Sequence, residues 1–204
     1  MWTVSFIPLR PGSLAGTHER SDAARNRERL LGAARELIEE CGPDGLTMDG
    51  LAERAGVGKG TVFRRFGSRA GLMITLLSDA EADFQARFMF GPPPLGPGAP
   101  GMERLIAFGV ERISFVLQYG ELARAADKSV HNRFDVPAVG LWHRHIEHLL
   151  REEGVEADPW LLAMSLSASL DPEWVLHAVH VHGVTTERLA NSWRELVTRV
   201  VRGA

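Results

Sequence analysis

The sequence predicts an all-α protein in two parts, and three observations support this prediction. Apolar residues recur every three or four positions through most of the 204 residues, and no stretch alternates as a half-buried strand would. Two short helical patterns meet across the three-residue connection Gly56-Val57-Gly58. Residues 91–101, with five prolines and four glycines, interrupt the helical pattern and can form neither helix nor strand.

The first part of the chain is expected to hold an arm and three helices. Residues 1–21 lack helical periodicity and are predicted to be a flexible arm, followed by a helix-turn-helix domain over residues 22–70. Gly42 and Pro43 are expected to end the first helix. The apolar face of that helix is Leu30, Ala34, Leu37, Ile38 and Cys41.

The next two helices have the pattern of a helix-turn-helix. Thr47 is the expected N-cap of the first, whose inward residues are Met48, Leu51, Ala52 and Ala55. In the second, Val62 and Phe66 are four residues apart and point to the same core. This leaves the polar side chains outside, at Lys59, Thr61, Arg64 and Arg65. In such a pair the second helix enters the major groove N-terminus first.

Residues 25–77 resemble the DNA-binding domain of the tetracycline-repressor (TetR) family. The resemblance is carried by Ala33-Ala34 to Cys41, Gly45-Leu46-Thr47, Leu51-Ala52, Ala55-Gly56-Val57, Lys59-Gly60-Thr61, and Phe66 with Ser68-Arg69 and Leu72. It implies that Lys59, Thr61 and Arg64 lie near bases, with Thr47, Arg65 and Arg69 at the DNA backbone. The full predicted DNA-binding set is Thr47, Gly58, Lys59, Gly60, Thr61, Phe63, Arg64, Arg65 and Arg69.

Two positions depart from the family pattern in ways that matter chemically. Gly58 stands where the family usually has Ser or Thr, so a side-chain cap and a phosphate contact are missing. Phe63 replaces the usual Tyr, whose hydroxyl commonly donates to a phosphate. These changes leave open an alternative, in which a degenerate helix-turn-helix serves as a protein-interaction module without binding DNA.

The C-terminal domain, residues 71–204, is expected to be a helical bundle. A fourth helix from Ser68 through Phe88 links it to the first domain. Further helices are predicted over 102–118, ended by Gly120, over 121–128, and from Pro137 to about Glu153. Asp158-Pro159 and Asp171-Pro172 each resemble an N-cap with a first-turn proline, so residues 159–182 form two helices or one helix kinked at Pro172. Thr185 or Thr186 opens the last helix.

The family resemblance implies a homodimeric repressor that a small-molecule effector releases from a palindromic operator. Segments 160–182 and 187–201 carry apolar residues on more than one face, as a dimer interface would. The predicted interface is Leu161, Val175, Val179, Leu189, Trp193, Leu196, Val197 and Val200. The predicted effector site is Phe108, Phe115, Tyr119, Trp142, His145, Met164, Ser167, Trp174 and His177.

Charge and composition exclude several other classes. The net charge of −3 is uneven: residues 1–70 hold 11 Lys and Arg against 9 Asp and Glu, and residues 71–204 hold 12 against 17. This suits DNA contact at one end only. The single Cys41 excludes an intrachain disulfide, and no run is long enough to span a membrane or form a signal peptide, so a cytoplasmic protein is expected.

No cofactor is expected, and no enzymatic motif is recognisable: there is no P-loop, Ser-His-Asp order or framed carboxylate pair. Six histidines lie between residues 143 and 182, and the pairs His145/His148 and His177/His180 have a spacing that can chelate a transition metal. Without a cysteine or a firmly placed carboxylate nearby, we interpret them as surface or core histidines rather than as a metal site.

Overall fold

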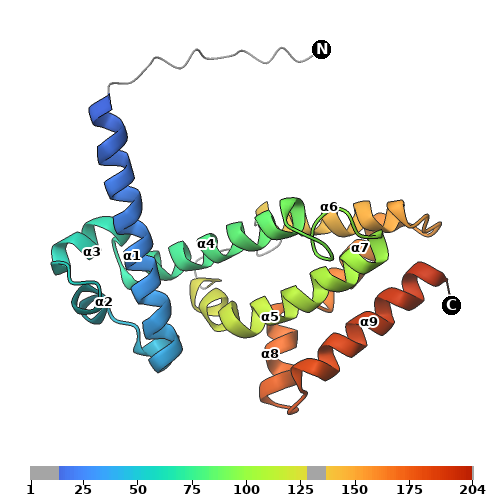
Figure 1. Cartoon of the computed structure of the whole chain (residues 1–204). Coiled ribbons are helices and arrows are strands. Elements are labelled where there is room, and N and C mark those ends of the chain that lie inside the picture. The colour runs from blue at the N-terminus through green and yellow to red at the C-terminus, as the bar shows by residue number, and fades with distance from the viewer. Residues whose placement is uncertain (1–13, 128–136, 204) are drawn as a thin grey trace. The chain divides into compact units, whose positions relative to one another are not determined.

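The protein is all-α, as the sequence predicts. A computed structural model describes residues 14–127 and 137–203, and these residues form nine helices and no β-sheet (Figure 1). The chain divides into two compact units, Met1–Arg69 and Ala70–Ala204. The sequence placed the domain boundary between residues 70 and 71.

Unit 1 begins with helix α1, Leu14–Gly45, which corrects the prediction of a flexible arm over residues 1–21. Residues 14–21 of that predicted arm are helical, and residues 1–13 lie outside the described part of the chain. The helix is interrupted at Gly42, whose φ of 73° and ψ of 171° are non-helical, and Pro43 follows in a short final turn. The expected break at Gly42 is therefore present.

Helices α2, Met48–Arg54, and α3, Lys59–Phe66, form the predicted pair. Thr47 caps α2, because its hydroxyl oxygen accepts a hydrogen bond from the Gly50 N–H at 3.0 Å. At the other end of α2, the Val57 N–H donates to the Ala52 carbonyl at 3.0 Å and the Gly56 N–H donates to the Glu53 carbonyl at 3.1 Å. This is a Schellman C-cap, with Gly56 at a φ of 63°.

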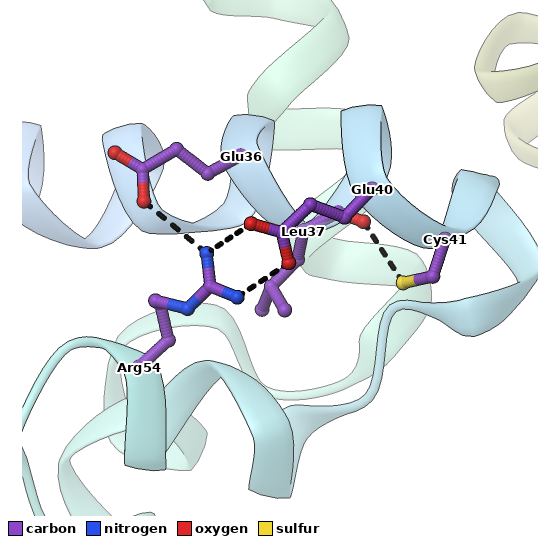
Figure 2. Close-up of polar contacts among 5 residues, drawn as sticks. All are labelled: Glu36, Leu37, Glu40, Cys41 and Arg54. Carbon is purple, nitrogen blue, oxygen red and sulfur yellow. Dashed lines mark hydrogen bonds and ion pairs between the residues drawn. The ribbon is translucent and has the colours of Figure 1, made fainter.

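An ion-pair cluster fastens α2 to α1 (Figure 2). The Arg54 guanidinium, at the end of α2, donates to both carboxylate oxygens of Glu40 and, at 3.3 Å, to Glu36. Glu36 and Glu40 are one turn apart on α1, so a single planar fork reaches both. Arg54 holds the pKa of the Glu40 carboxyl below its usual value through this hydrogen bonding.

Unit 2 is a bundle built around the long helix α5, Gly101–Asp127, which packs against α6, Pro137–Glu152, α8, Pro172–His180, and α9, Thr186–Arg202. Helix α4, Arg69–Phe90, leads into it, and α7, Pro159–Ala168, packs against α6. The Pro- and Gly-rich segment 91–100 is irregular, as predicted.

The predicted break of α5 at Gly120 is wrong, because α5 runs through it without interruption. A Cβ at Gly120 would lie 2.9 Å from Cδ1 of Leu176 on α8. The missing side chain therefore lets α8 pack closely against the backbone of α5. A mid-helix glycine costs only about 1 kcal/mol relative to alanine, which burial of a leucine side chain outweighs.

Residues 159–180 form two helices, which decides between the two alternatives for this segment. Asp158 caps α7 and Asp171 caps α8, and each carboxylate accepts hydrogen bonds from two backbone N–H groups of the following turn. Each cap is followed by a proline at the first helical position, where its missing N–H costs nothing. Thr185 caps α9 with its hydroxyl, which accepts one hydrogen bond from the Arg188 N–H at 3.3 Å.

Four residues predicted for a dimer interface instead fill the core of unit 2. Val175, Leu189, Trp193 and Val197 are all buried within one hydrophobic cluster. Val179 and Val200 are partly buried and pack against that cluster. The helical stripe that these residues form is therefore used inside the subunit, and only Leu161 and Leu196 of the predicted set are exposed.

The closest packing in this core predicts a large difference between two Gly→Ala substitutions. The Trp193 indole lies against Gly109 of α5 and donates to the carbonyls of Leu105 and Ile106 at 3.2 and 3.1 Å. Because an added methyl would overlap the indole, Gly109→Ala should lower the free energy of unfolding by about 1–3 kcal/mol. The control Gly32→Ala, in α1 with nothing within 4 Å of the added Cβ, should raise it by up to about 1 kcal/mol. Urea denaturation measures both, and equal effects would contradict this packing.

Candidate functional site

Helix α3 is held by two apolar side chains and shows the rest of its surface to solvent. Val62 is fully buried and Phe66 is nearly so. The remaining side chains are exposed or half-exposed: Lys59, Thr61, Phe63, Arg64 and Arg65. The inward and outward faces are those that the sequence predicts, and they leave a short helix with a cationic outer face.

The cationic side chains of α3 differ in their neighbours. The Lys59 ammonium lies 2.6 Å from Asp49 of α2, and both side chains are more than half exposed. Arg64 donates to the Thr61 hydroxyl at 3.3 Å, one turn earlier on the same helix. Exposed ion pairs of this kind are weak and are easily exchanged for a phosphate partner. The side chains are thus accessible to an anionic partner.

Arg69 has an internal role that the sequence did not predict. Its guanidinium donates to the carbonyls of Leu46 at 2.9 Å and Pro43 at 2.6 Å, and it lies 3.4 Å from Asp44. These contacts hold the first residue of α4 against the segment that precedes α2. They occupy three of the five N–H donors of Arg69, which was predicted to contact the DNA backbone.

The two positions that depart from the family pattern, Gly58 and Phe63, change what α3 offers at its surface. Gly58 is the N-cap of α3 in extended conformation, and no side-chain hydrogen bond caps the helix there. Phe63 is 47% exposed and offers an apolar ring where a hydroxyl would donate. An anionic partner of the outer face of α3 would therefore be held by the cations of that face and by the backbone N–H groups at the start of α3.

A buried cluster of polar side chains, which the sequence analysis did not predict, lies inside unit 2; we call it the polar group. Arg112 of α5 is 5% exposed, and its Nη1 is 3.7 Å from Oε2 of Glu81 on α4. The indole N–H of Trp142, on α6, donates to Oε1 of Glu81 at 2.8 Å. The Arg112 guanidinium stacks over the Trp142 ring at 3.8 Å and over Phe115 at 4.8 Å.

Burial sets the charge state of this group. Desolvation raises the pKa of the Glu81 carboxyl, and the nearby Arg112 cation opposes the rise. Desolvation also lowers the pKa of Arg112 to about 10, so the guanidinium is still protonated at neutral pH. The available sequence signal was a charge within an apolar face: Glu81 lies four residues after Leu77 and three before Phe84.

A row of rings leads from Arg112 to His145. Phe115 lies 5.7 Å from Phe84, Phe84 lies 5.4 Å from Phe108, and Phe108 lies 5.3 Å from His145. His145 also lies 4.5 Å from Phe88, and its Nε2 has no hydrogen-bond partner among the described residues. Desolvation, with the charge of Arg104, lowers the pKa of His145 to about 4, so the ring is neutral at neutral pH.

The structure gathers part of the predicted effector site and separates the rest. Phe108, Phe115 and His145 belong to the row of rings, and Tyr119 joins it 5.0 Å from Phe115. Trp142 lies against Arg112 at the start of the row. Ser167 is partly buried, with a hydroxyl that has no partner among the described residues. Three other predicted members are exposed to solvent: Met164, Trp174 and His177.

The paired histidines do not converge on one point. His145 is buried among phenylalanines, and His148 lies 3.5 Å from Glu152 at the surface. His177 packs against the His182 ring, and His180 lies 3.9 Å from Glu121. Among the residues that the structure describes, no group of three or more His, Cys, Asp or Glu is placed to hold a metal ion.

Comparison with known proteins agrees with this geometry. Residues 30–76 match the family described as "Bacterial regulatory proteins, tetR family". An HTH-type transcriptional regulator of Staphylococcus aureus (strain bovine RF122 / ET3-1) is 36% identical over 69 residues. That match covers 34% of this chain and 37% of the relative, so it spans little more than a third of the relative's length.

Solved structures extend the similarity of fold to most of the chain. A TetR-family transcriptional regulator from Rhodococcus sp. superimposes with a TM-score of 0.66 at 20% identity, covering 87% of this chain and 99% of that one. A TetR-like regulator from Rhodococcus sp. RHA1 gives 0.57 at 19% identity, covering 88% and 97%. A short helix α3 with an outward-facing polar side, packed beside α2, is the arrangement of a helix-turn-helix domain. Residues 30–76 thus match the DNA-binding domain of the TetR family, and the fold of the described chain is similar to that of TetR-like regulators.

The buried His145 predicts a loss of stability in mild acid. Its folded-state pKa of about 4 lies below the usual 6.5, so its contribution is present above pH 6.5 and is lost as the pH falls toward 4. The loss should reach up to about 3 kcal/mol. Urea denaturation at pH 7.5 and pH 5 should show a smaller difference in His145→Phe than in the wild type. The exposed control His180→Gln should keep the wild-type difference, and an unchanged difference in His145→Phe would count against a neutral, buried ring.

Proposed function

We propose that this protein is a homodimeric DNA-binding repressor of the cytoplasm, released from a palindromic operator when a small-molecule effector binds in unit 2. The observation that carries the proposal is the outward cationic face of α3, fixed from behind by Val62 and Phe66. Burying one side of so short a helix leaves its other side free for a groove.

DNA contact is proposed to divide between bases and backbone. Lys59 and Thr61 lie in the first turn of α3, and Arg64 lies one turn after Thr61 on the same face. These three side chains would reach base edges, and Arg65 with Thr47 would contact phosphate. Engagement of Lys59 requires its ion pair with Asp49 to be exchanged for a DNA contact, which is favourable where phosphate density is high. Affinity should therefore fall steeply with added salt.

Dimerisation is proposed through the outer faces of α7 and α8, in place of the buried residues predicted from sequence. On α7, Trp160, Leu161 and Met164 are 52%, 54% and 36% exposed. Trp174 of α8 is 51% exposed, and Val181, the C-cap of α8, is 64% exposed. Large apolar side chains at helical spacing on two consecutive helices are typical of an interface. A two-fold dimer would present two α3 helices to successive major grooves, about 34–36 Å apart.

Effector control is proposed to be a shift between two conformations of the dimer, only one of which matches the groove spacing. Helix α4 is the route by which the chain passes from unit 1 into unit 2. An effector in unit 2 changes operator affinity only through its different affinities for the two conformations.

Sequencing of genomic fragments retained by the purified protein tests the proposal directly. A recovered palindrome whose half-sites lie one helical turn apart supports it. Recovery of no DNA at low salt would favour the alternative, a protein-interaction module.

Arg64→Ala should weaken the complex with the recovered palindrome by about ten- to hundredfold in a gel shift, because each good base contact is worth about 1–3 kcal/mol. The control Arg199→Ala removes an equally charged side chain from α9, which pairs with Glu195 at the surface. It should bind like the wild type. Equal affinities for Arg64→Ala and wild type would remove Arg64 from the contact surface.

The double substitution Leu161→Asp/Trp174→Asp should convert the dimer to a monomer in sedimentation velocity, because it places charges in the proposed apolar interface. The control Phe90→Asp changes a side chain that is 80% exposed at the end of α4, outside this face, and should remain dimeric. Circular dichroism confirms folding of both. A dimeric double variant would show that subunits associate elsewhere.

A further inference from the structure

One end of the buried Arg112 guanidinium, its Nη1, donates no hydrogen bond to any described residue, although Glu81 and Asp171 both favour its charge. Its Nη1 is 3.7 Å from the Glu81 carboxylate, beyond hydrogen-bonding distance, and has no hydrogen-bond partner among the described residues. Aromatic faces of Trp142 and Phe115 cover the guanidinium plane but accept no N–H bond in that plane. A desolvated arginine in this state gains strongly from an acceptor placed in plane with its N–H groups.

The Glu81 carboxylate is a poor permanent partner for Arg112. Its Oε1 accepts both the Trp142 indole N–H at 2.8 Å and the Gln85 amide at 3.1 Å, and these bonds hold it away from the guanidinium. Its side chain is 13% exposed, and burial disfavours its charged form. Glu81 is therefore a tethered carboxylate near, but not on, the arginine.

We propose that the effector of this protein is a carboxylate carried by an aromatic or other apolar body, and that its carboxylate displaces Glu81 from Arg112. Carboxylate oxygens fit the planar fork of arginine in pairs, which Glu81 does not achieve. The apolar body would lie against the partly exposed rings beside Arg112, which are Phe115, Tyr119 and Trp142. This inference rests on the proposed effector control.

Displacement of Glu81 would act on the helix that matters for control. Glu81 is on α4, Arg112 on α5 and Trp142 on α6, so the polar group ties α4 to the two helices beside it. Glu81 shares its face of α4 with Phe84, Gln85 and Phe88, three, four and seven residues later. An acid that takes its place on Arg112 releases this tie and lets α4 adopt a second position.

Calorimetric titration of the DNA-free full-length protein tests the proposal, with phenylalkanoates from phenylacetate to 6-phenylhexanoate and their neutral amides as probes. At least one acid should bind wild type ten times more tightly than its amide. Arg112→Met should lose this preference. Glu81→Gln should bind the acid about tenfold more tightly, because the internal competitor has lost its charge while its amide oxygen still accepts from Trp142.

The matched control is Arg87→Met, which removes a surface ion pair between the same two helices, α4 and α5, at 2.7 Å from Glu111. It should bind the acids like the wild type. If Arg112→Met does not fold, Glu81→Gln decides. Equal binding of acids and amides, no binding of any acid to wild type or Glu81→Gln, or no tightening in Glu81→Gln overturns the proposal.

Operator binding is measured separately, by gel shift with and without the acid. An acid that binds through Arg112 to a protein that does not bind DNA would overturn the proposed function and leave the carboxylate site standing. Operator binding that no acid affects, together with failed titrations, would overturn the site and leave DNA binding standing.

Discussion

The burial of Arg112 between two aromatic rings is the constraint around which the interior of unit 2 is arranged. A guanidinium that is 5% exposed must find charge and π-electron partners nearby, and it finds them on two other helices, as Glu81 and Trp142. Arg112 lies near the middle of α5, and α5 is the helix that packs against α6, α8 and α9. The same helix also receives Trp193 at Gly109, so its exact placement serves both the apolar core and the polar group.

Unit 1 solves a different problem, which is to expose a short helix without losing it. An eight-residue helix such as α3 is unstable in isolation, and two buried side chains with a tight preceding turn hold it in place. The Arg54 contacts with Glu36 and Glu40 secure α2 from outside the apolar core (Figure 2). Arg69 secures the start of α4. The cations left on α3 therefore project from a fixed support, and this is the physical basis for the proposed groove contact.

The two units suggest how sensing and binding can be separated within one chain. The cationic face in unit 1 is exposed and weakly paired, which suits the proposed contact with DNA. The polar group in unit 2 is buried and leaves Arg112 Nη1 without a hydrogen-bond partner among the described residues, which suits the proposed small apolar carboxylate. Helix α4 carries Glu81 within unit 2 and begins at Arg69 in unit 1.

Local patterns in the sequence determined the helices, their caps and the two faces of α3, because periodicity, Asp-Pro pairs and the Gly56-Val57-Gly58 turn act within a few residues. Contacts distant in sequence were decided only by the tertiary structure. Arg54 meets Glu40 and Arg112 meets Glu81 across different helices, and nothing in either segment specifies that partner. The same reason explains why Gly120 did not end a helix and why Trp193 and Val197 turned inward, since an apolar helical face can be satisfied by its own chain or by another.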